Sequence, residues 1–152
     1  MQENLTIRTE PFDRLTVREL FAIVRLRQQV FYLEQHVSCD DWDPIDPQSI
    51  CVWAACGGET VGFLRIVPPG VVYDEASIGR VAVAPAHRRS GIARRMVGEA
   101  LRYIERTWGT PVRISSQEYI IPFYEQMGFG IVSERYMEAG IPHRKMLLKT
   151  KE

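Results

Sequence analysis

The sequence has few cysteines, no surplus of either charge and no long hydrophobic run. Cys39, Cys51 and Cys56 are odd in number and lack CxxC spacing, so we expect reduced thiols rather than disulfides, a zinc site or a cysteine nucleophile. The 19 basic and 19 acidic side chains cancel, which gives no reason to expect nucleic acid or an anionic membrane as a partner. No stretch approaches the roughly 20 apolar residues of a membrane span, and residues 1–4 lack the features of a signal peptide. We therefore expect a cytoplasmic protein without a metal ion.

The length and composition fit one soluble domain. The chain has 152 residues, of which 45% are hydrophobic and 25% charged, as in ordinary globular proteins. It contains no internal repeat and no low-complexity tract. We predict a single domain over residues 1–152, as a monomer or a homodimer.

One stretch, residues 77–104, has the pattern of a strand, a basic turn and a helix in succession. Residues 77–83 form a short apolar run that Ala84-Pro85 ends, which is typical of a buried strand. Between Ala93 and Ile104 apolar residues recur at helical spacing, and arginines fall mostly on the other face. The helix is therefore expected to begin at a turn rich in arginine.

The first turn of this helix is suited to an anion. Its unpaired backbone N–H groups carry a partial positive charge, so a phosphate is the natural ligand. Gly91 has no side chain to block the approach, and Arg88 and Arg89 can hold phosphate oxygens in a bidentate manner. The alternative is a surface turn whose arginines only keep the helix end soluble, which is the commoner case for a single glycine between arginines.

Two motifs in order make the phosphate site the better interpretation. Arg88, Gly91 and Ala93 fill the fixed positions of the pattern Arg/Gln-x-x-Gly-x-Gly/Ala, so the turn resembles the acyl-CoA loop of the GNAT N-acetyltransferases. Downstream, residues 124–129 resemble the Tyr-x-x-x-Gly-Phe segment of the same family. Within the family the chain looks most like the ElaA-type acetyltransferases, through residues 27–31 and through further matches at Glu34-Gln35, the aspartates before Ile50, and Gly140-Ile141-Pro142-His143.

The resemblance implies acetyl-CoA as the co-substrate and a set of residues that hold it. The pyrophosphate would lie on Arg88, Arg89, Ser90, Gly91, Ile92, Ala93 and Arg94. In the family, the strands that correspond to residues 77–83 and 112–116 splay apart and admit the pantetheine arm. This implies backbone contacts at Val81, Ala82 and Val83, with the Val83 N–H as the donor to the oxyanion.

Patterning along the chain predicts the element order β-α-loop-β-β-β-α-β-α-β-β. The expected elements are an edge strand over 5–10, a helix from a capping box at 16–19 to about Val30, a hairpin of 49–56 and 60–67 around Gly57-Gly58, the strand and helix of 77–104, a strand over 112–116, a short helix from Pro122 to Gly128, and strands over 130–136 and 143–149. Leu20, Phe21, Val24 and Phe31 share one face of the first helix, which Ile23, Leu26 and Val30 widen, so we expect this face to be buried. The order is that of an α/β protein with the GNAT fold, a central mixed, partly parallel sheet flanked by helices and splayed at the strand that precedes the pyrophosphate loop.

Between Tyr32 and Gln48 the regular pattern gives way to acids and prolines. Taken singly, each acid is most simply a turn cap. Together, five acids beside Phe31, Tyr32 and Trp42 would form an anionic, aromatic-walled rim that attracts a cationic amine; these acids are Glu34, Asp40, Asp41, Asp43 and Asp46. We expect the acceptor to contact Phe31, Glu34, Asp40 and Asp41.

Acetyl transfer from a thioester to an amine needs a neutral amine, donors for the oxyanion and a proton for the departing thiolate. We predict that Tyr124 supplies this proton; the alternative is a packed ring with a tethered hydroxyl. Several residues could act as the general base, and the sequence does not select among them: Glu34, Asp40, Asp41, Asp46, Glu118 and His143.

The sequence therefore favours an acyl-CoA-dependent N-acetyltransferase that acts on a primary amine, either a small molecule or an exposed amino group. Two other functions stay open. Residues 27–46, followed by 65–68, also resemble acyl-homoserine-lactone synthases, which share the fold and use acyl donors. A non-catalytic acyl-CoA-binding sensor is the third possibility.

Overall fold

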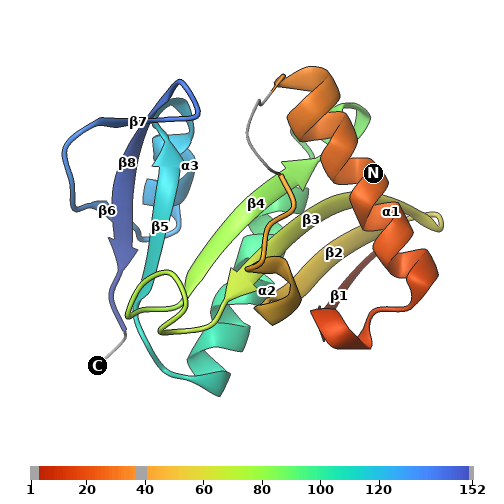
Figure 1. The fold of residues 1–152 in the computed structure, drawn as a ribbon, viewed down its shortest axis with the longest axis horizontal. Helices are drawn as coiled ribbons and strands as arrows, with labels where there is room; N and C mark the ends of the chain where they lie inside the picture. The colour runs from red at the N-terminus through yellow and green to blue at the C-terminus, as the bar shows by residue number, and fades with distance from the viewer. Residues whose placement is uncertain (1–3, 37–40, 151–152) are drawn as a thin grey trace.

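The computed structural model describes residues 4–36 and 41–150, and the strands in these ranges form two antiparallel sheets (Figure 1). The first sheet has the order β1 (Leu5–Pro11), β2 (Ile50–Cys56), β3 (Glu59–Val67) and β4 (Ser77–Val83). In the second, β8 (Ile141–Leu148) lies between β5 (Val112–Gln117) and β6 (Gly130–Ile131), and β7 (Tyr136–Glu138) also pairs with β8. Because β1 pairs with β2 alone among the described strands, it is the edge strand that the sequence predicted.

The two sheets meet where β4 and β5 begin. An isolated parallel bridge joins Ala76 to Val112, and the Arg113 N–H donates to the Ala76 carbonyl oxygen at 2.9 Å. Every ladder within the two sheets is antiparallel across the residues described. The expected single mixed, partly parallel sheet is therefore present as two antiparallel sheets with this one parallel bridge between them.

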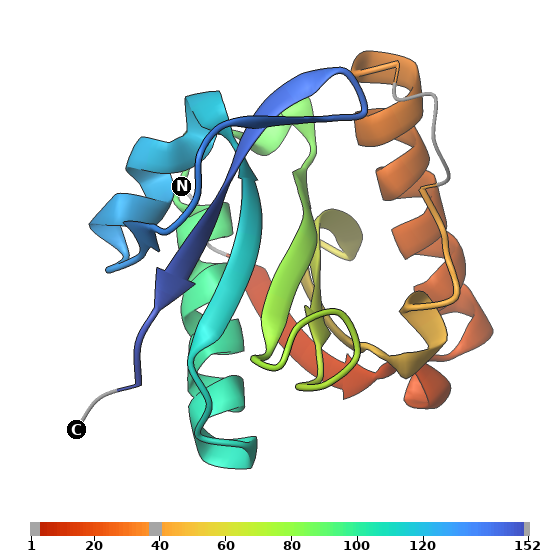
Figure 2. The same ribbon diagram turned by 60° about the vertical axis from the view of Figure 1, so that its left-hand side comes forward.

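Helices α1 (Val17–Arg27) and α2 (Ile92–Thr107) cover opposite faces of the first sheet (Figure 2). The predicted capping box begins α1: the Glu19 N–H donates to Thr16 Oγ1 at 3.1 Å, and the Thr16 N–H donates to Glu19 Oε1 at 2.9 Å. After Arg27 the helix continues as a π-helical turn over Gln28–Glu34. This turn carries the end of the helix toward the acidic loop.

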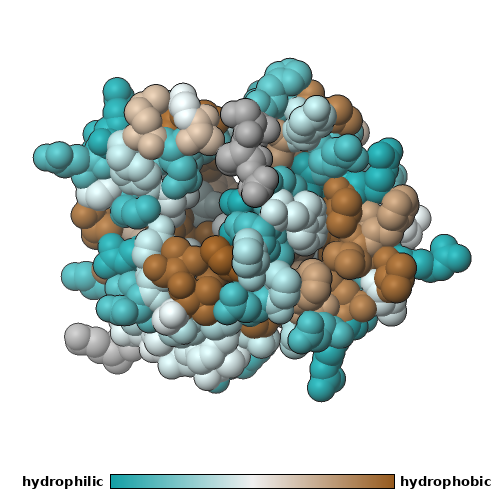
Figure 3. Space-filling model, in the orientation of Figure 1, coloured by the Kyte–Doolittle hydropathy of each residue, from teal (hydrophilic) through white to brown (hydrophobic). Residues whose placement is uncertain are grey.

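The buried face of α1 differs from the predicted one. Ile23, Leu26, Arg27 and Val30 are buried, whereas Phe21 is 66% exposed, and apolar side chains gather on the surface over α1 (Figure 3). Arg27 lies at the centre of the buried face, so this face is not the one that the hydrophobic residues alone indicate. The prediction that Phe21 is buried is wrong for this reason.

Helix α2 packs closely on β3 because Gly62 has no side chain. A Cβ at Gly62 would lie 2.9 Å from the Met96 Cε atom and 3.1 Å from the Ile92 Cγ2 atom, which is closer than van der Waals packing allows. Both side chains are fully buried. The start of α2 is thus fixed against the sheet at the point where the arginine turn enters it.

Most of the other predicted elements are present. Gly57 and Gly58 form the two-residue turn between β2 and β3, both with positive φ. Pro122 lies in the first turn of α3 (Ile121–Gln126), and Gly128 follows with φ 101°. The expected strand over 130–136 is instead the two short strands β6 and β7, while short 3-10 turns cover Phe12–Arg14, Asp46–Gln48, Pro85–His87 and Glu118–Ile120.

No helix within the described ranges is long and apolar enough to cross a bilayer. Over the same ranges, no group of histidine, cysteine and acidic side chains is placed to hold a metal ion. Cys51 is a free, buried thiol, and burial raises its pKa to about 12; Cys39 lies outside the described residues. A thiol with such a high pKa is a poor nucleophile at neutral pH.

Candidate functional site

Two cavities lie along β4. The first, of about 440 Å³, separates β4 from β5 beyond the parallel bridge. The second, of about 390 Å³, lies at the start of α2. Val81 lines the first cavity and Val83 the second, while Ala82 points into the core between them. This alternation is that of an ordinary strand, and it makes β4 a shared wall of both cavities.

The second cavity is built from the arginine turn that the sequence singled out. Gly91 precedes α2 with φ 84°, and a Cβ at this position would meet no atom within 4 Å. The lining residues are Val83, His87, Arg88, Arg89, Gly91, Ile92, Ala93, Arg94 and Phe123. Ser90 is not among them, because its hydroxyl donates to the His87 carbonyl oxygen at 2.5 Å and closes the turn. Six of the seven predicted loop residues therefore surround one cavity at a helix N-terminus.

The Arg88 side chain is already bound to an anion of the chain itself. Its Nη1 and Nη2 atoms donate to the Glu34 carboxylate at 2.5 and 2.6 Å, and its Nε donates to the Val83 carbonyl oxygen at 2.9 Å. The hydrogen bonds from Arg88 hold the pKa of Glu34 below its usual value. Arg88, which is predicted to bind phosphate, and Glu34, which is predicted to contact the acceptor, are thus paired with each other.

The backbone of Val83 points away from β3. The Ala84 N–H donates to the Val61 carbonyl oxygen at 2.8 Å, and Val83 is opposite Gly62. In an antiparallel ladder this pattern marks the Val83–Gly62 pair as one without mutual hydrogen bonds. The Val83 N–H is therefore directed out of the first sheet and is not used in its ladder.

A β-bulge deforms β4 beside the first cavity. Ala82 lies opposite Phe63 and Gly79 opposite Arg65, with a shift of register between them. At this shift Arg80 has φ 52°, a left-handed conformation that is uncommon for a residue with a side chain. Its Nε donates to the Asp41 carbonyl oxygen at 3.0 Å, so the acidic loop holds the bulge in place.

The acids of this loop are paired with arginines. Arg27, completely buried, donates to Asp46 at 2.8 Å and forms an ion pair with Asp41 at 3.2 Å. Arg65 donates to Asp43 at 2.8 Å. Burial alone would raise the pKa of Asp43, but the hydrogen bonds and charge of Arg65 outweigh it and lower the pKa.

This pairing corrects the expected anionic rim. Asp41, Asp43 and Asp46 are neutralised by arginines, and the Trp42 ring is covered by the Arg27 guanidinium, whose Cζ lies 3.5 Å from the ring centroid. Phe31 and Asp41 nevertheless line the first cavity, so contact with an acceptor stays a prediction for both. Asp40 lies outside the described residues.

Tyr124 lines the first cavity from α3 and is almost completely buried. Its ring packs edge to face on Phe123 and Phe129, with centroids 5.1 and 5.6 Å apart. Burial raises the pKa of its hydroxyl to about 12. The ring is thus packed as the alternative interpretation expected, yet the hydroxyl is protonated at neutral pH and belongs to a side chain that lines the cavity.

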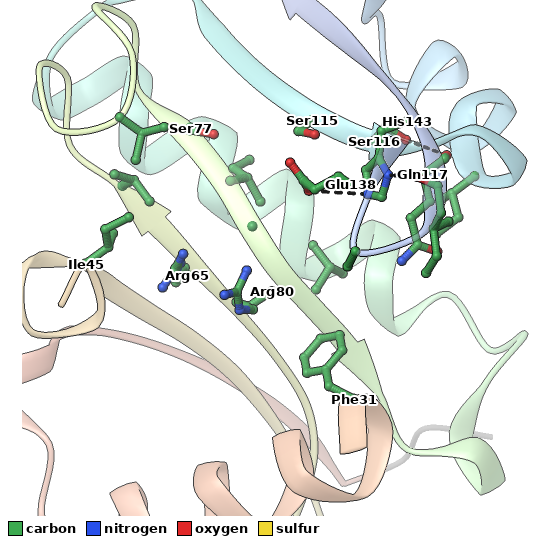
Figure 4. A pocket seen from close by; sticks show the side chains of 18 of the residues that line it. Phe31, Ile45, Arg65, Ser77, Arg80, Ser115, Ser116, Gln117, Glu138 and His143 are labelled. Carbon is green, nitrogen blue, oxygen red and sulfur yellow. Dashed lines mark hydrogen bonds and ion pairs between the residues drawn. The ribbon is translucent and has the colours of Figure 1, made fainter. Parts of the chain in front are cut away.

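His143, one of the six candidate bases, lines the first cavity together with Glu138, which the sequence did not identify (Figure 4). They lie on β8 and β7, which a turn at Ala139 and Gly140 joins, and His143 pairs with Tyr136 across this hairpin. The His143 Nε2 atom lies 3.4 Å from Glu138 Oε2. For Glu138 the available signal in the sequence was Gly140, because a glycine turn at this point brings residues five apart in sequence onto neighbouring strands.

The structure describes five of the six candidate bases, all except Asp40. Glu34, Asp41 and Asp46 are paired with arginines, as described above. Glu118 accepts from Arg135 at 2.5 and 2.9 Å and from Arg144 at 3.3 Å, and the hydrogen bonds from Arg135 lower its pKa. Of the six, His143 alone, within the described residues, lines a cavity and has no arginine partner.

Comparisons with known proteins agree with the geometry. A family model described as an acetyltransferase (GNAT) domain matches residues 24–150. A UPF0039 protein of Schizosaccharomyces pombe is 34% identical over 149 residues, which cover 96% of this chain and 98% of that protein. The crystal structure of Escherichia coli ElaA has a TM-score of 0.89 and 28% identity, covering 95% of this chain and 99% of that one. An acyl-CoA N-acyltransferase from Pseudomonas aeruginosa has the same TM-score and coverage with 32% identity.

Proposed function

Because the chain belongs to the GNAT acetyltransferase family, we propose that it transfers an acetyl group from acetyl-CoA directly to a primary amine. The observation that carries this proposal is the pair of cavities along β4. One surrounds a helix N-terminus with arginines, and the other is lined by Tyr124 and His143. A long acyl donor with an anionic end could occupy both at once.

Residues 88–94 suit the pyrophosphate of CoA. The unpaired N–H groups at the start of α2 and the guanidinium groups of Arg88, Arg89 and Arg94 favour an anion. Gly91 leaves room for the pyrophosphate, because it has no side chain and no other atom lies within 4 Å of the place where a Cβ would be. Its left-handed conformation also favours glycine. The pantetheine arm would then follow β4 toward the first cavity, past the outward-facing peptide groups of Val83.

The reaction needs a donor to the oxyanion and a proton donor to the thiolate, and this chain offers a candidate for each beside β4. The Val83 N–H, directed away from β3, is our candidate donor to the tetrahedral oxyanion. Tyr124 is our candidate proton donor to the leaving thiolate. With a pKa of about 12 against roughly 8.5 for a thiol in water, this transfer is uphill by about 4.8 kcal/mol. Burial of the sulfur raises the pKa of the thiol as well, which narrows the gap.

The acceptor amine sets the demand for a base. An amine with a pKa near 10.4 costs roughly 4.6 kcal/mol to deprotonate at pH 7, whereas an α-amine near 7.8 costs about 1 kcal/mol. The identity of the acceptor therefore decides how much of the rate depends on a general base.

Two measurements test the proposal. CoA at 100 times its Kd should stabilise the fold by about 2.7 kcal/mol, seen as a raised melting temperature. Release of CoA thiol from acetyl-CoA should depend on an added primary amine in a panel of alkylamines, amino acids and peptide N-termini. A thermal shift without turnover of any amine would favour an acyl-CoA sensor, and no shift at millimolar CoA would exclude both functions.

A further inference from the structure

The structure assigns the general base of the proposed acetyl transfer to His143, with Glu138 and the Ile141 carbonyl as the groups that position it. This inference rests on the proposed function, because a base has a role only if an amine is the acceptor. His143 is almost completely buried yet lines the first cavity, which Tyr124 lines as well. A candidate base and a candidate acid thus line one cavity.

The hydrogen bond of His143 to the backbone fixes its tautomer. Its Nδ1 atom lies 2.7 Å from the Ile141 carbonyl oxygen, and a carbonyl oxygen can only accept. Nδ1 must therefore carry a proton, which leaves the lone pair of the neutral ring on Nε2. Nε2 is the nitrogen that can take a proton from an amine.

One carboxylate lies within ion-pair distance of Nε2. When Nε2 takes a proton it lies 3.4 Å from the Glu138 carboxylate, which stabilises the imidazolium. The ring also stacks on Tyr136 at a centroid distance of 6.0 Å, and the hydroxyl of Tyr136 is hydrogen-bonded to Ser115. These contacts hold the ring in one orientation toward the cavity.

Other charged groups face the cavity from the opposite wall. Arg65 and Arg80 lie toward the first sheet, across the cavity from His143 (Figure 4), and Asp41 pairs with Arg80. Lys145 lies over the Tyr136 ring, 4.6 Å from its centroid. Because Glu138 is the carboxylate within ion-pair distance of Nε2, it is the group that we expect to stabilise the charged ring.

The proton balance of the step is complete with these residues. An ammonium acceptor gives one proton to His143 Nε2, which passes it to solvent, and the neutral nitrogen attacks the thioester carbon. The C–N bond forms and the C–S bond breaks. As the intermediate collapses, the nitrogen loses its second proton to solvent and the sulfur departs as a thiol with a proton from Tyr124. The tyrosinate then regains a proton from solvent, so that one proton is released overall.

The test compares the rates of acetylation of two small amines at a constant concentration of acetyl-CoA. At pH 7 methylamine is almost wholly protonated, whereas hydroxylamine is largely uncharged. His143→Asn replaces the Nδ1 donor to Ile141 and removes Nε2. It should lower kcat/KM for methylamine by about 10²-fold or more, the usual contribution of a general base, and that for hydroxylamine by less than about tenfold.

The controls separate a base from a structural residue. Glu134→Gln removes an exposed carboxylate from the same region and should leave both rates unchanged. Glu138→Gln should lower the methylamine rate by less than His143→Asn does. His143→Gln, which keeps more of the side-chain volume, serves if the asparagine variant fails to fold.

The outcomes decide separately for the base and for the transfer. Equal losses for the two amines in a folded variant, or no loss for either, would overturn the assignment of His143. A parent protein that binds CoA but acetylates neither these two amines nor any other amine of the panel would contradict the proposed transfer itself, and the role of His143 with it.

Discussion

Removal of the Glu34 carboxylate should tighten the binding of CoA. In the free protein both guanidinium Nη atoms of Arg88 donate to Glu34, and both side chains are 38% exposed. If Arg88 turns to the pyrophosphate, this ion pair must break or be shared. Glu34→Gln keeps the size of the side chain and removes its charge.

The expected gain follows from the value of an exposed ion pair. Such pairs contribute about 0.2 to 1 kcal/mol, and this free energy no longer opposes binding once the carboxylate is gone. The Kd for CoA should therefore fall by about 1.4-fold to fivefold. Loss of a negative charge near the pyrophosphate acts in the same direction, and added salt should reduce the whole effect.

Isothermal titration calorimetry with CoA at low and high ionic strength measures this change. Glu105→Gln is the matched control, because it removes one exposed carboxylate from α2 outside the lining of the second cavity. Weaker binding by a folded Glu34→Gln variant would refute the reasoning. It would mean that Glu34 holds Arg88 in the conformation that binds, so that the pair prepares the site.

Four further outcomes are expected from the same structure. Gly91→Glu should abolish CoA binding in calorimetry, while Gly91→Ala, which carries only the strain of about 1–2 kcal/mol at a left-handed position, should still bind and serves as its control. Tyr124→Phe should lower kcat at least about tenfold and leave the affinity for CoA within a few-fold of the parent value. Because the pKa of the Tyr124 hydroxyl is about 12, deprotonation of Tyr124 should cause no loss of the parent's rate below pH 10. An unchanged kcat in the phenylalanine variant, with chemistry rate-limiting, would make Tyr124 a structural residue. Arg27→Ala should cost about 3 kcal/mol in denaturant unfolding, the low end for breaking a buried ion pair, because Asp46 keeps an ion pair with Arg65 at 3.2 Å and Asp41 keeps one with Arg80 at 3.3 Å. Because the pKa of Asp43 is lower in the folded protein than its usual value near 3.8, its ionisation stabilises the fold. This stabilisation is complete above pH 3.8 and is lost as the pH falls through the pKa of Asp43 in the folded protein. An unchanged unfolding free energy in Arg27→Ala would contradict the role of Arg27, and an unfolding free energy that does not fall in acid would contradict the role of Asp43.

The sequence was most informative where the determinants are local. Residues 77–83 were predicted as a strand, and β4 has the same bounds. The capping box of α1, the Gly57-Gly58 turn and the proline at the start of α3 are short-range signals, and all are present. The arginine turn belongs to this class, because a glycine, two arginines and a helix start adjoin in sequence.

The buried face of α1 could not be predicted in the same way. Hydrophobic periodicity assumes that charged residues lie outside, but Arg27 is completely buried. Its partners, Asp41 and Asp46, are 14 and 19 residues away, and their approach depends on the path of a loop without regular structure. The same long-range pairing removed the charge from the predicted acidic rim.

The acidic loop therefore acts on the site through the backbone of β4. A left-handed conformation at Arg80 costs roughly 1–2 kcal/mol without compensation. The hydrogen bond to the Asp41 carbonyl oxygen and the ion pair with Asp43 at 3.3 Å supply that compensation. The bulge that they hold precedes Val81 and Val83, which line the two cavities. Acids that the sequence suggested as ligands of an amine thus help to hold the strand that lines both cavities.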